Sequence, residues 1–184
     1  MALILASGSP RRRELLGLIT ADFEVRVPEV EERVPAGLTP AETVAYLAAL
    51  KGRAAAERFP ADTVIAADTV VEADGVILGK PKDDSDAKAM LRALSGRTHH
   101  VFTGVFIKGP RGERRFYEDT AVEFYPLTDG EIDAYVATGE PADKAGAYGI
   151  QGLGALLVKG ITGDYYNVVG FPVAAIARAL KEVE

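Results

Sequence analysis

The chain has 184 residues, 48% of them apolar and 26% charged, with a net charge of −6 at pH 7. This composition predicts one globular domain over residues 1–184 and disfavours a non-specific nucleic-acid-binding protein, which needs a basic surface. The lack of cysteine excludes disulfides and thiolate metal sites, and no apolar run approaches the ~20 residues of a membrane span. Without a recognisable export signal, we expect a cytoplasmic protein with no membrane partner.

The first elements are an apolar run at 3–5 and a helix that begins after a Ser/Gly turn. Ser7 ends the predicted strand, Ser9 is a suitable N-cap and Pro10 suits the first helical position. Free N–H groups at the helix start, next to the arginines at 11–13, would suit a phosphate group, and Ser7 and Ser9 of the turn are candidate phosphate-binding residues. The alternative is a capped helix whose arginines are merely solvated.

The alternation at 23–27 predicts a half-buried strand, and a capping box at Thr39 opens a predicted helix to about residue 58 that carries Lys51. Between them, either Glu31 or Glu32 would suit a metal ion. As an isolated charge run, a solvated surface is the favoured interpretation. Lys51, on an amphipathic helix, would by itself be only an exposed cation.

The continuous apolar run at 63–67 predicts a strand buried on both faces, followed directly by Asp68 and Thr69. A carboxylate beside a buried strand is costly unless it is paired or binds a metal. Asp68 is therefore the strongest single candidate for a functional group. The structural alternative is an aspartate that caps a turn or pairs with a lysine.

A hairpin turn at 73–76 and a return strand at 76–78 lead to Lys80, which lies between Gly79 and Pro81. This rigid position suits a lysine that contacts phosphate, although a plain surface lysine fits as well. An acidic stretch at 83–86 opens a predicted helix that Gly96 closes.

Two long strands at 101–108 and 115–125, joined by a Gly-Pro turn, predict an antiparallel pair. His99 and His100 are adjacent, so on a strand they would point to opposite faces, which argues against a histidine metal site. A second capping box opens a helix at 128–139.

The stretch 142–152 is dense in glycine and small residues around polar ones, which lets the backbone approach a ligand closely. Gln151 can present both a donor and an acceptor to a base edge, and Tyr148 can stack or pack in the core. We expect a short strand at 155–159, a structural role for 165–170 and a terminal helix from residue 171. Strand–helix alternation with hairpins predicts an α/β or α+β domain with a mixed sheet.

These segments together resemble the Maf family of nucleoside triphosphate pyrophosphatases. They occur in the family's order and cover nearly the whole chain. The matching segments are Leu5-Ala6-Ser7-Gly8-Ser9-Pro10-Arg11-Arg12, Ala67-Asp68-Thr69-Val70-Val71, Gly79-Lys80-Pro81, Leu94-Ser95-Gly96-Arg97-Thr98-His99, Asp143-Lys144-Ala145-Gly146-Ala147-Tyr148-Gly149-Ile150-Gln151-Gly152 and Asn167-Val168-Val169-Gly170.

The resemblance implies a mixed α/β fold like that of the inosine triphosphate pyrophosphatases, with a long central mixed sheet, flanking helices, a cleft between two lobes and a homodimeric state. It implies metal-dependent hydrolysis of nucleoside triphosphates, namely dTTP, UTP and modified pyrimidine nucleotides, to the monophosphate and pyrophosphate by attack of water at the α-phosphorus, with Mg²⁺ or Mn²⁺ as cofactor. A non-catalytic regulator of septum formation, acting by binding nucleotide or protein, is the alternative from another class.

The resemblance also implies roles for single residues. Asp68 matches the family's general base, and whether it acts as base or as metal ligand with Glu32 stays open. Specificity positions match Arg11, Thr69 and Gln151, and further active-site positions match Arg12, Lys51, Lys80 and Glu32. Arg11 and the 143–152 run resemble the branch that acts on dTTP and UTP, rather than the branch that acts on methylated GTP.

Overall fold

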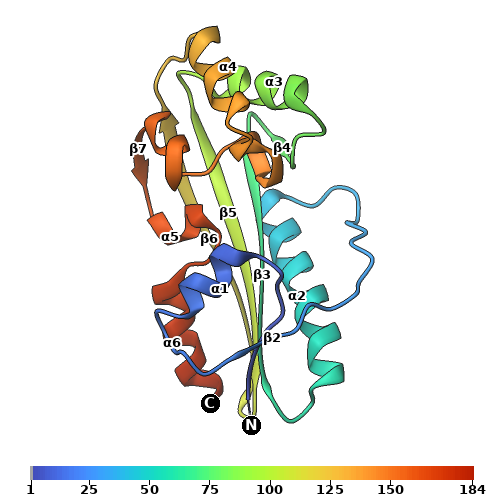
Figure 1. The fold of residues 1–184 in the computed structure, drawn as a ribbon. Helices are drawn as coiled ribbons and strands as arrows, with labels where there is room; N and C mark the ends of the chain where they lie inside the picture. The colour runs from blue at the N-terminus through green and yellow to red at the C-terminus, as the bar shows by residue number, and fades with distance from the viewer. Residues whose placement is uncertain (1) are drawn as a thin grey trace. The chain divides into compact units, whose positions relative to one another are not determined.

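The structure is a computed structural model that describes residues 2–184 (Figure 1). Within this range, no helix combines the length and the apolar character that crossing a membrane requires. The chain divides into two compact units. The first comprises the chain up to Thr69, Thr103–Glu118 and Gly170–Glu184, and the second comprises Val70–Phe102 and Asp119–Val169.

A seven-stranded mixed sheet has the strand order β2-β1-β3-β5-β6-β7, with β4 paired to β3. β1 runs parallel to both β2 and β3, whereas β3–β4 and β6–β7 are antiparallel. The expected mixed α/β sheet is thereby confirmed. The strands are β1 (Leu3–Leu5), β2 (Glu24–Val25), β3 (Thr63–Ala73), β4 (Val76–Leu78), β5 (Thr98–Gly109), β6 (Gly112–Phe124) and β7 (Val158–Thr162).

The helices begin where the sequence places their caps. Ser9 caps the first helix, and complete capping boxes at Thr39 and Thr128 open two others, because each threonine and the glutamate three residues later satisfy each other's backbone N–H groups. The α-helices are α1 (Pro10–Leu16), α2 (Pro40–Arg58), α3 (Asp84–Leu94), α4 (Asp129–Ala137), α5 (Tyr165–Val169) and α6 (Val173–Val183), with 3-10 turns η1 (Glu140–Asp143), η2 (Ala145–Ala147) and η3 (Gly152–Leu156).

In the first unit, α2 lies on one side of the strands, and α1 and α6 lie on the other (Figure 1). Two glycines allow α2 to pack closely. A Cβ on Gly104 would lie 2.3 Å from the Val44 backbone, and one on Gly52 would lie 2.0 Å from the Phe106 ring. The core beneath α2 is made mostly of small and branched side chains, with one aromatic ring, namely Ile4, Ala6, Ala48, Ala49, Ala55, Ala56, Val64, Ala66 and Phe106.

In the second unit, α3 and α4 pack together over a separate apolar core. Leu91, Leu94, Val122, Phe124 and Ile132 are almost completely buried in it. α3 begins as its acidic start predicts, since the Asp83 side chain accepts from the Asp86 N–H group.

Three sequence expectations need correction. The half-buried strand at 23–27 is a two-residue edge strand with both side chains exposed. The strand at 63–67 continues to residue 73, so Asp68 and Thr69 lie within β3 rather than after it. The prediction of a strand at 155–159 is wrong, because residues 152–156 form a 3-10 turn and the strand β7 starts only at Val158. The left-handed Gly152 (φ 66°) starts that turn.

Candidate active site

The turn between β1 and α1 has the structure that its sequence predicts. The Ser9 Oγ accepts a hydrogen bond of 3.5 Å from the Arg12 N–H group, and the Ser7 Oγ accepts one of 3.3 Å from the Ser9 N–H group. Ser7 is buried. Both hydroxyls thus form bonds within the turn, and the bonds to the Arg12 N–H group and guanidinium help to hold that arginine in place.

The Arg12 guanidinium is held by three hydrogen bonds. Its Nε donates to the Gly170 carbonyl at 2.9 Å, one Nη donates to the Ser7 Oγ at 3.3 Å, and the other Nη donates to the Thr69 Oγ1 at 3.0 Å. The planar guanidinium matches three acceptors that arrive from three separate segments. Arg12 thus has one orientation before any ligand arrives.

Arg12 also lies in a cluster of charges. The pKa of Arg12 is lowered, mainly by burial and to a smaller extent by the neighbouring charge of Arg11. The carboxylates of Asp68 and Glu32 act in the opposite direction and raise the pKa, but they do not outweigh burial. A guanidinium nevertheless stays charged in proteins. Arg11, Glu32 and Asp68 are therefore all close enough to Arg12 to act on its charge.

Lys51 brings two carboxylates together. Its Nζ lies 2.6 Å from Asp68 Oδ1 and 3.1 Å from Glu32 Oε2. The side chains of Lys51 and Asp68 are 17% and 14% exposed, whereas Glu32 is 49% exposed. Asp68 does pair with a lysine, as its structural alternative proposed. That alternative does not account for Glu32, which reaches the same ammonium group from the chain before α2.

Thr69 connects the arginine to the next strand. Its Oγ1 accepts from Arg12 and lies 2.9 Å from the Thr103 Oγ1, which is buried in β5. Gly170 has φ 110°, and a Cβ there would lie 3.3 Å from the same Thr69 oxygen. The positive φ and the close approach of the backbone to Thr69 together explain why this position is a glycine.

Lys80 and Gln151 belong to the second unit. The Gly79 carbonyl accepts a hydrogen bond of 3.0 Å from the Gly146 N–H group, so the turn that carries the exposed Lys80 contacts the glycine-rich stretch directly. Gln151 is half-buried and precedes η3, and its side-chain amide does not cap that turn.

The comparisons with known proteins agree with these motifs. The family model described as "Maf-like protein" matches residues 2–183. The chain belongs to the Maf family. A protein of Bacillus cytotoxicus named dTTP/UTP pyrophosphatase is 54% identical over 98% of this chain and 95% of its own length. A protein of a Geobacillus species with the same name is 51% identical over 98% of this chain and 97% of its own length.

Among solved structures, a HAM1 protein from Coxiella burnetii matches with a TM-score of 0.54 at 18% identity, over 98% of both chains. This likeness shows the fold, and it agrees with the inosine triphosphate pyrophosphatase-like architecture that the Maf resemblance implies.

Two residues of this Maf chain were not among the candidates from the sequence. Thr103 had no local signal, because it is one of several alternating residues of a long strand. Gly170 closes the Asn167–Gly170 motif, whose conformation the sequence left unassigned. Asn167 has the structural role expected of its segment, since its Nδ2 donates to the Val101 carbonyl and to the Thr120 Oγ1.

Tyr148 is a core residue rather than a stacking platform. It is buried, and its hydroxyl lies 2.7 Å from the Nε2 of His99. Both rings meet Phe124 edge-on. His99 is buried and His100 is partly exposed, as expected of adjacent residues on one strand.

Glu32 and Asp68 fit the divalent ion that the family implies. Their oxygens converge on one cation, the Lys51 ammonium group, so they already form a position where positive charge is held between two carboxylates. Mg²⁺ is commonly bound by one or two carboxylates together with substrate phosphates. Within residues 2–184, no group of three or more acidic or histidine side chains could hold a metal ion.

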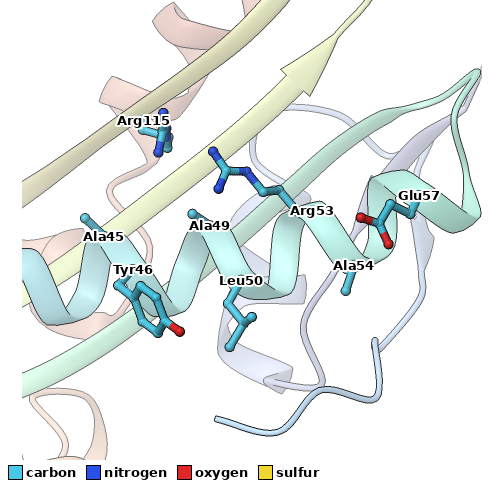
Figure 2. A pocket seen from close by; sticks show the side chains of 8 residues that line it. All are labelled: Ala45, Tyr46, Ala49, Leu50, Arg53, Ala54, Glu57 and Arg115. Carbon is cyan, nitrogen blue, oxygen red and sulfur yellow. The ribbon is translucent and has the colours of Figure 1, made fainter. Parts of the chain in front are cut away.

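Two pockets of the first unit differ in whether candidate residues line them. One of about 420 Å³ is lined by Ser7, Ser9 and neighbours from α1 and β2, at the turn between β1 and α1. Another of about 620 Å³ lies along α2 and contains none of the candidate residues (Figure 2). Its lining is Ala45, Tyr46, Ala49, Leu50, Arg53, Ala54, Glu57 and Arg115.

Proposed function

We propose that this protein hydrolyses dTTP and UTP to the monophosphate and pyrophosphate. The observation that carries the proposal is the agreement with relatives named dTTP/UTP pyrophosphatase, which are 51–54% identical over 98% of the chain. The arrangement of Arg12, Lys51, Asp68 and Thr69 in the first unit supports it. These residues combine cations for phosphate oxygens with a carboxylate that can accept a proton.

Arg11, Arg12 and Lys51 are proposed to bind the triphosphate, with Lys80 as a further phosphate contact. Arg12 is already oriented by Gly170, Ser7 and Thr69, so little conformational entropy is lost when a phosphate binds it. Guanidinium groups bind phosphate through paired N–H groups, whereas lysines act as point charges. Together these cations would offset the charge that the leaving pyrophosphate develops.

Asp68 is proposed to orient a water molecule and take its proton during in-line attack at the α-phosphorus. One carboxylate oxygen is held by Lys51, which aims the group. The Asp68 side chain is 14% exposed, so the carboxylate is not fully closed off from water. Lys51 thus serves as the residue that positions the base.

Glu32 and Asp68 are the residues that would hold a Mg²⁺ or Mn²⁺ ion, together with phosphate oxygens. When bound, such an ion neutralises negative charge on the phosphates and supports the leaving group.

Base selection is assigned to Gln151, with Arg11 and Thr69 as further specificity positions. The Gln151 amide offers one donor and one acceptor, which is the pattern needed for the edge of uracil or thymine. A site that tolerates the 5-methyl group of thymine would accept both dTTP and UTP.

The test is pyrophosphate release from dTTP, UTP, CTP, GTP and methylated GTP with Mg²⁺, Mn²⁺ or Co²⁺. We expect dTTP and UTP to be preferred, and Asp68→Asn to lower turnover by ~10²–10⁴-fold, the usual contribution of a general base. The exposed Asp22→Asn is the matched control and should keep wild-type turnover. Release from no triphosphate would overturn the proposal and favour the non-catalytic regulator of septum formation.

We further propose that the protein is a homodimer and acts in the cytoplasm. Light scattering should give twice the 19.5 kDa mass of the chain, and cell fractionation should recover the protein with the cytoplasmic enzymes.

A further inference from the structure

The carboxylate of Glu140 lies at the centre of a hydrogen-bond network in the second unit. Its Oε1 accepts from the Tyr135 hydroxyl at 2.9 Å and from the Gly154 N–H group at 3.0 Å, and its Oε2 accepts from the Leu153 N–H group at 3.1 Å. Two successive backbone donors of η3 are thus satisfied by one side chain from η1.

Tyr135 extends this network to the other end of the same loop. While its hydroxyl donates to Glu140, its oxygen accepts from the Gly149 N–H group at 3.2 Å. The loop 149–154 is therefore attached at both ends to one Tyr–Glu pair. Gln151, a half-buried residue whose side chain does not cap η3, lies between the two points of attachment.

The glycines of the loop lie in close contact with neighbouring groups. A Cβ on Gly154 would lie 1.9 Å from the Gly149 carbonyl oxygen, so the two ends of the loop touch. A Cβ on Gly152 would lie 2.8 Å from Glu140 Oε2, and one on Gly149 would lie 2.7 Å from the stem of Lys144. The Lys144 ammonium group in turn donates to the Glu140 carbonyl at 2.7 Å.

Glu140 holds the loop as an anion. Burial by itself raises the pKa of Glu140, but the N–H groups of Gly154 and Leu153, the Tyr135 hydroxyl and the charge of Lys144 outweigh it, so that the pKa is lowered. Hydrogen bonds to a charged acceptor are about twice as strong as neutral ones. The network is therefore strongest at neutral pH.

We propose that Glu140, with Tyr135, is a positioning residue that sets the base specificity of the enzyme by holding the Gln151 amide in place. This inference rests on the proposed function, because it takes Gln151 as the residue that contacts the base. Neither Glu140 nor Tyr135 is required to touch the substrate.

Glu140→Gln is the sharpest variant, because it keeps the shape of the side chain and replaces one acceptor oxygen by a donor NH₂ that faces a backbone N–H group. We expect the ratio of kcat/KM for dTTP to that for CTP to fall about tenfold, mainly through a higher KM for dTTP, as suits the loss of a charged hydrogen bond. Amide hydrogen exchange at Leu153 and Gly154 should accelerate. Tyr135→Phe, which removes only the hydroxyl, should lower the same ratio less and accelerate exchange at Gly149.

Glu131→Gln is the matched control. Glu131 also accepts backbone and hydroxyl hydrogen bonds from one partner, Thr128, but it does so at the start of α4. A loss of stability alone would appear in this variant too, whereas the substrate ratio should not change.

The outcomes separate the two proposals. If Gln151→Ala abolishes the wild-type preference while Glu140→Gln and Tyr135→Phe keep it, the positioning role is overturned and the proposed function stands. If the wild-type protein releases pyrophosphate from no triphosphate, or if Gln151→Ala keeps the full preference, the base-reading assignment is wrong and the positioning role falls with it.

Discussion

Stability should fall steeply in mild acid because of one buried histidine. His99 is 1% exposed, its Nε2 meets the Tyr148 hydroxyl at 2.7 Å, and within residues 2–184 its Nδ1 has no partner. Burial, with a smaller contribution from His100, lowers the pKa of His99 from 6.5 to about 4. The folded protein therefore keeps this ring neutral at pH values where the unfolded chain protonates it.

The sign and size of the effect follow from this difference. Between pH 6.5 and about 4, the unfolded state binds one more proton than the folded state, so stability is full above pH 6.5 and is lost as the pH falls towards 4. Because each pKa unit corresponds to ~1.4 kcal/mol, His99 alone should remove ~3 kcal/mol from the free energy of unfolding.

Urea denaturation followed by circular dichroism between about pH 4 and pH 7 measures this loss. His99→Gln keeps a partner for Tyr148 but cannot titrate, so its free energy of unfolding should fall ~3 kcal/mol less than that of the wild type over this range. His100→Gln, the adjacent partly exposed control, should keep most of the wild-type steepness. Parallel curves for the wild type and His99→Gln would refute the reasoning.

Two further predictions concern the first unit. Lys51→Met removes the cation that is proposed to bind phosphate and to aim the Asp68 carboxylate, so kcat/KM for dTTP should fall about a hundredfold. The exposed Lys181→Met should leave kcat/KM unchanged, and equal values for the two variants would contradict the assignment. Gly104→Ala places a Cβ 2.3 Å from the Val44 backbone and should lower the free energy of unfolding by ~3 kcal/mol in urea. Gly160→Ala, whose Cβ meets nothing within 4 Å, is its control, and equal stability of the two would count against close packing of α2.

The sequence by itself determined the features that depend on neighbouring residues. The caps at Ser9, Thr39 and Thr128 are confirmed because a capping bond joins residues only three apart. The buried run at 63–67 and the hairpin to β4 are confirmed because burial and turn conformation leave a local pattern. The candidate site residues were identified through the resemblance to family motifs. Their local sequence patterns alone were equally compatible, for most of them, with a purely structural role.

Strand extent and side-chain partners were decided only by the tertiary structure. β3 continues past Asp68 because it has neighbouring strands to pair with, and 155–159 fails as a strand because Glu140 holds the N–H groups that precede it. The hydrogen bond from Arg12 to Gly170 spans 158 residues of sequence, and the one between Thr69 and Thr103 spans 34. Periodicity reports which face of an element is buried, but not what lies against that face. The partners of Arg12 and Thr69 therefore emerge only when the folded backbone brings distant segments within hydrogen-bond distance.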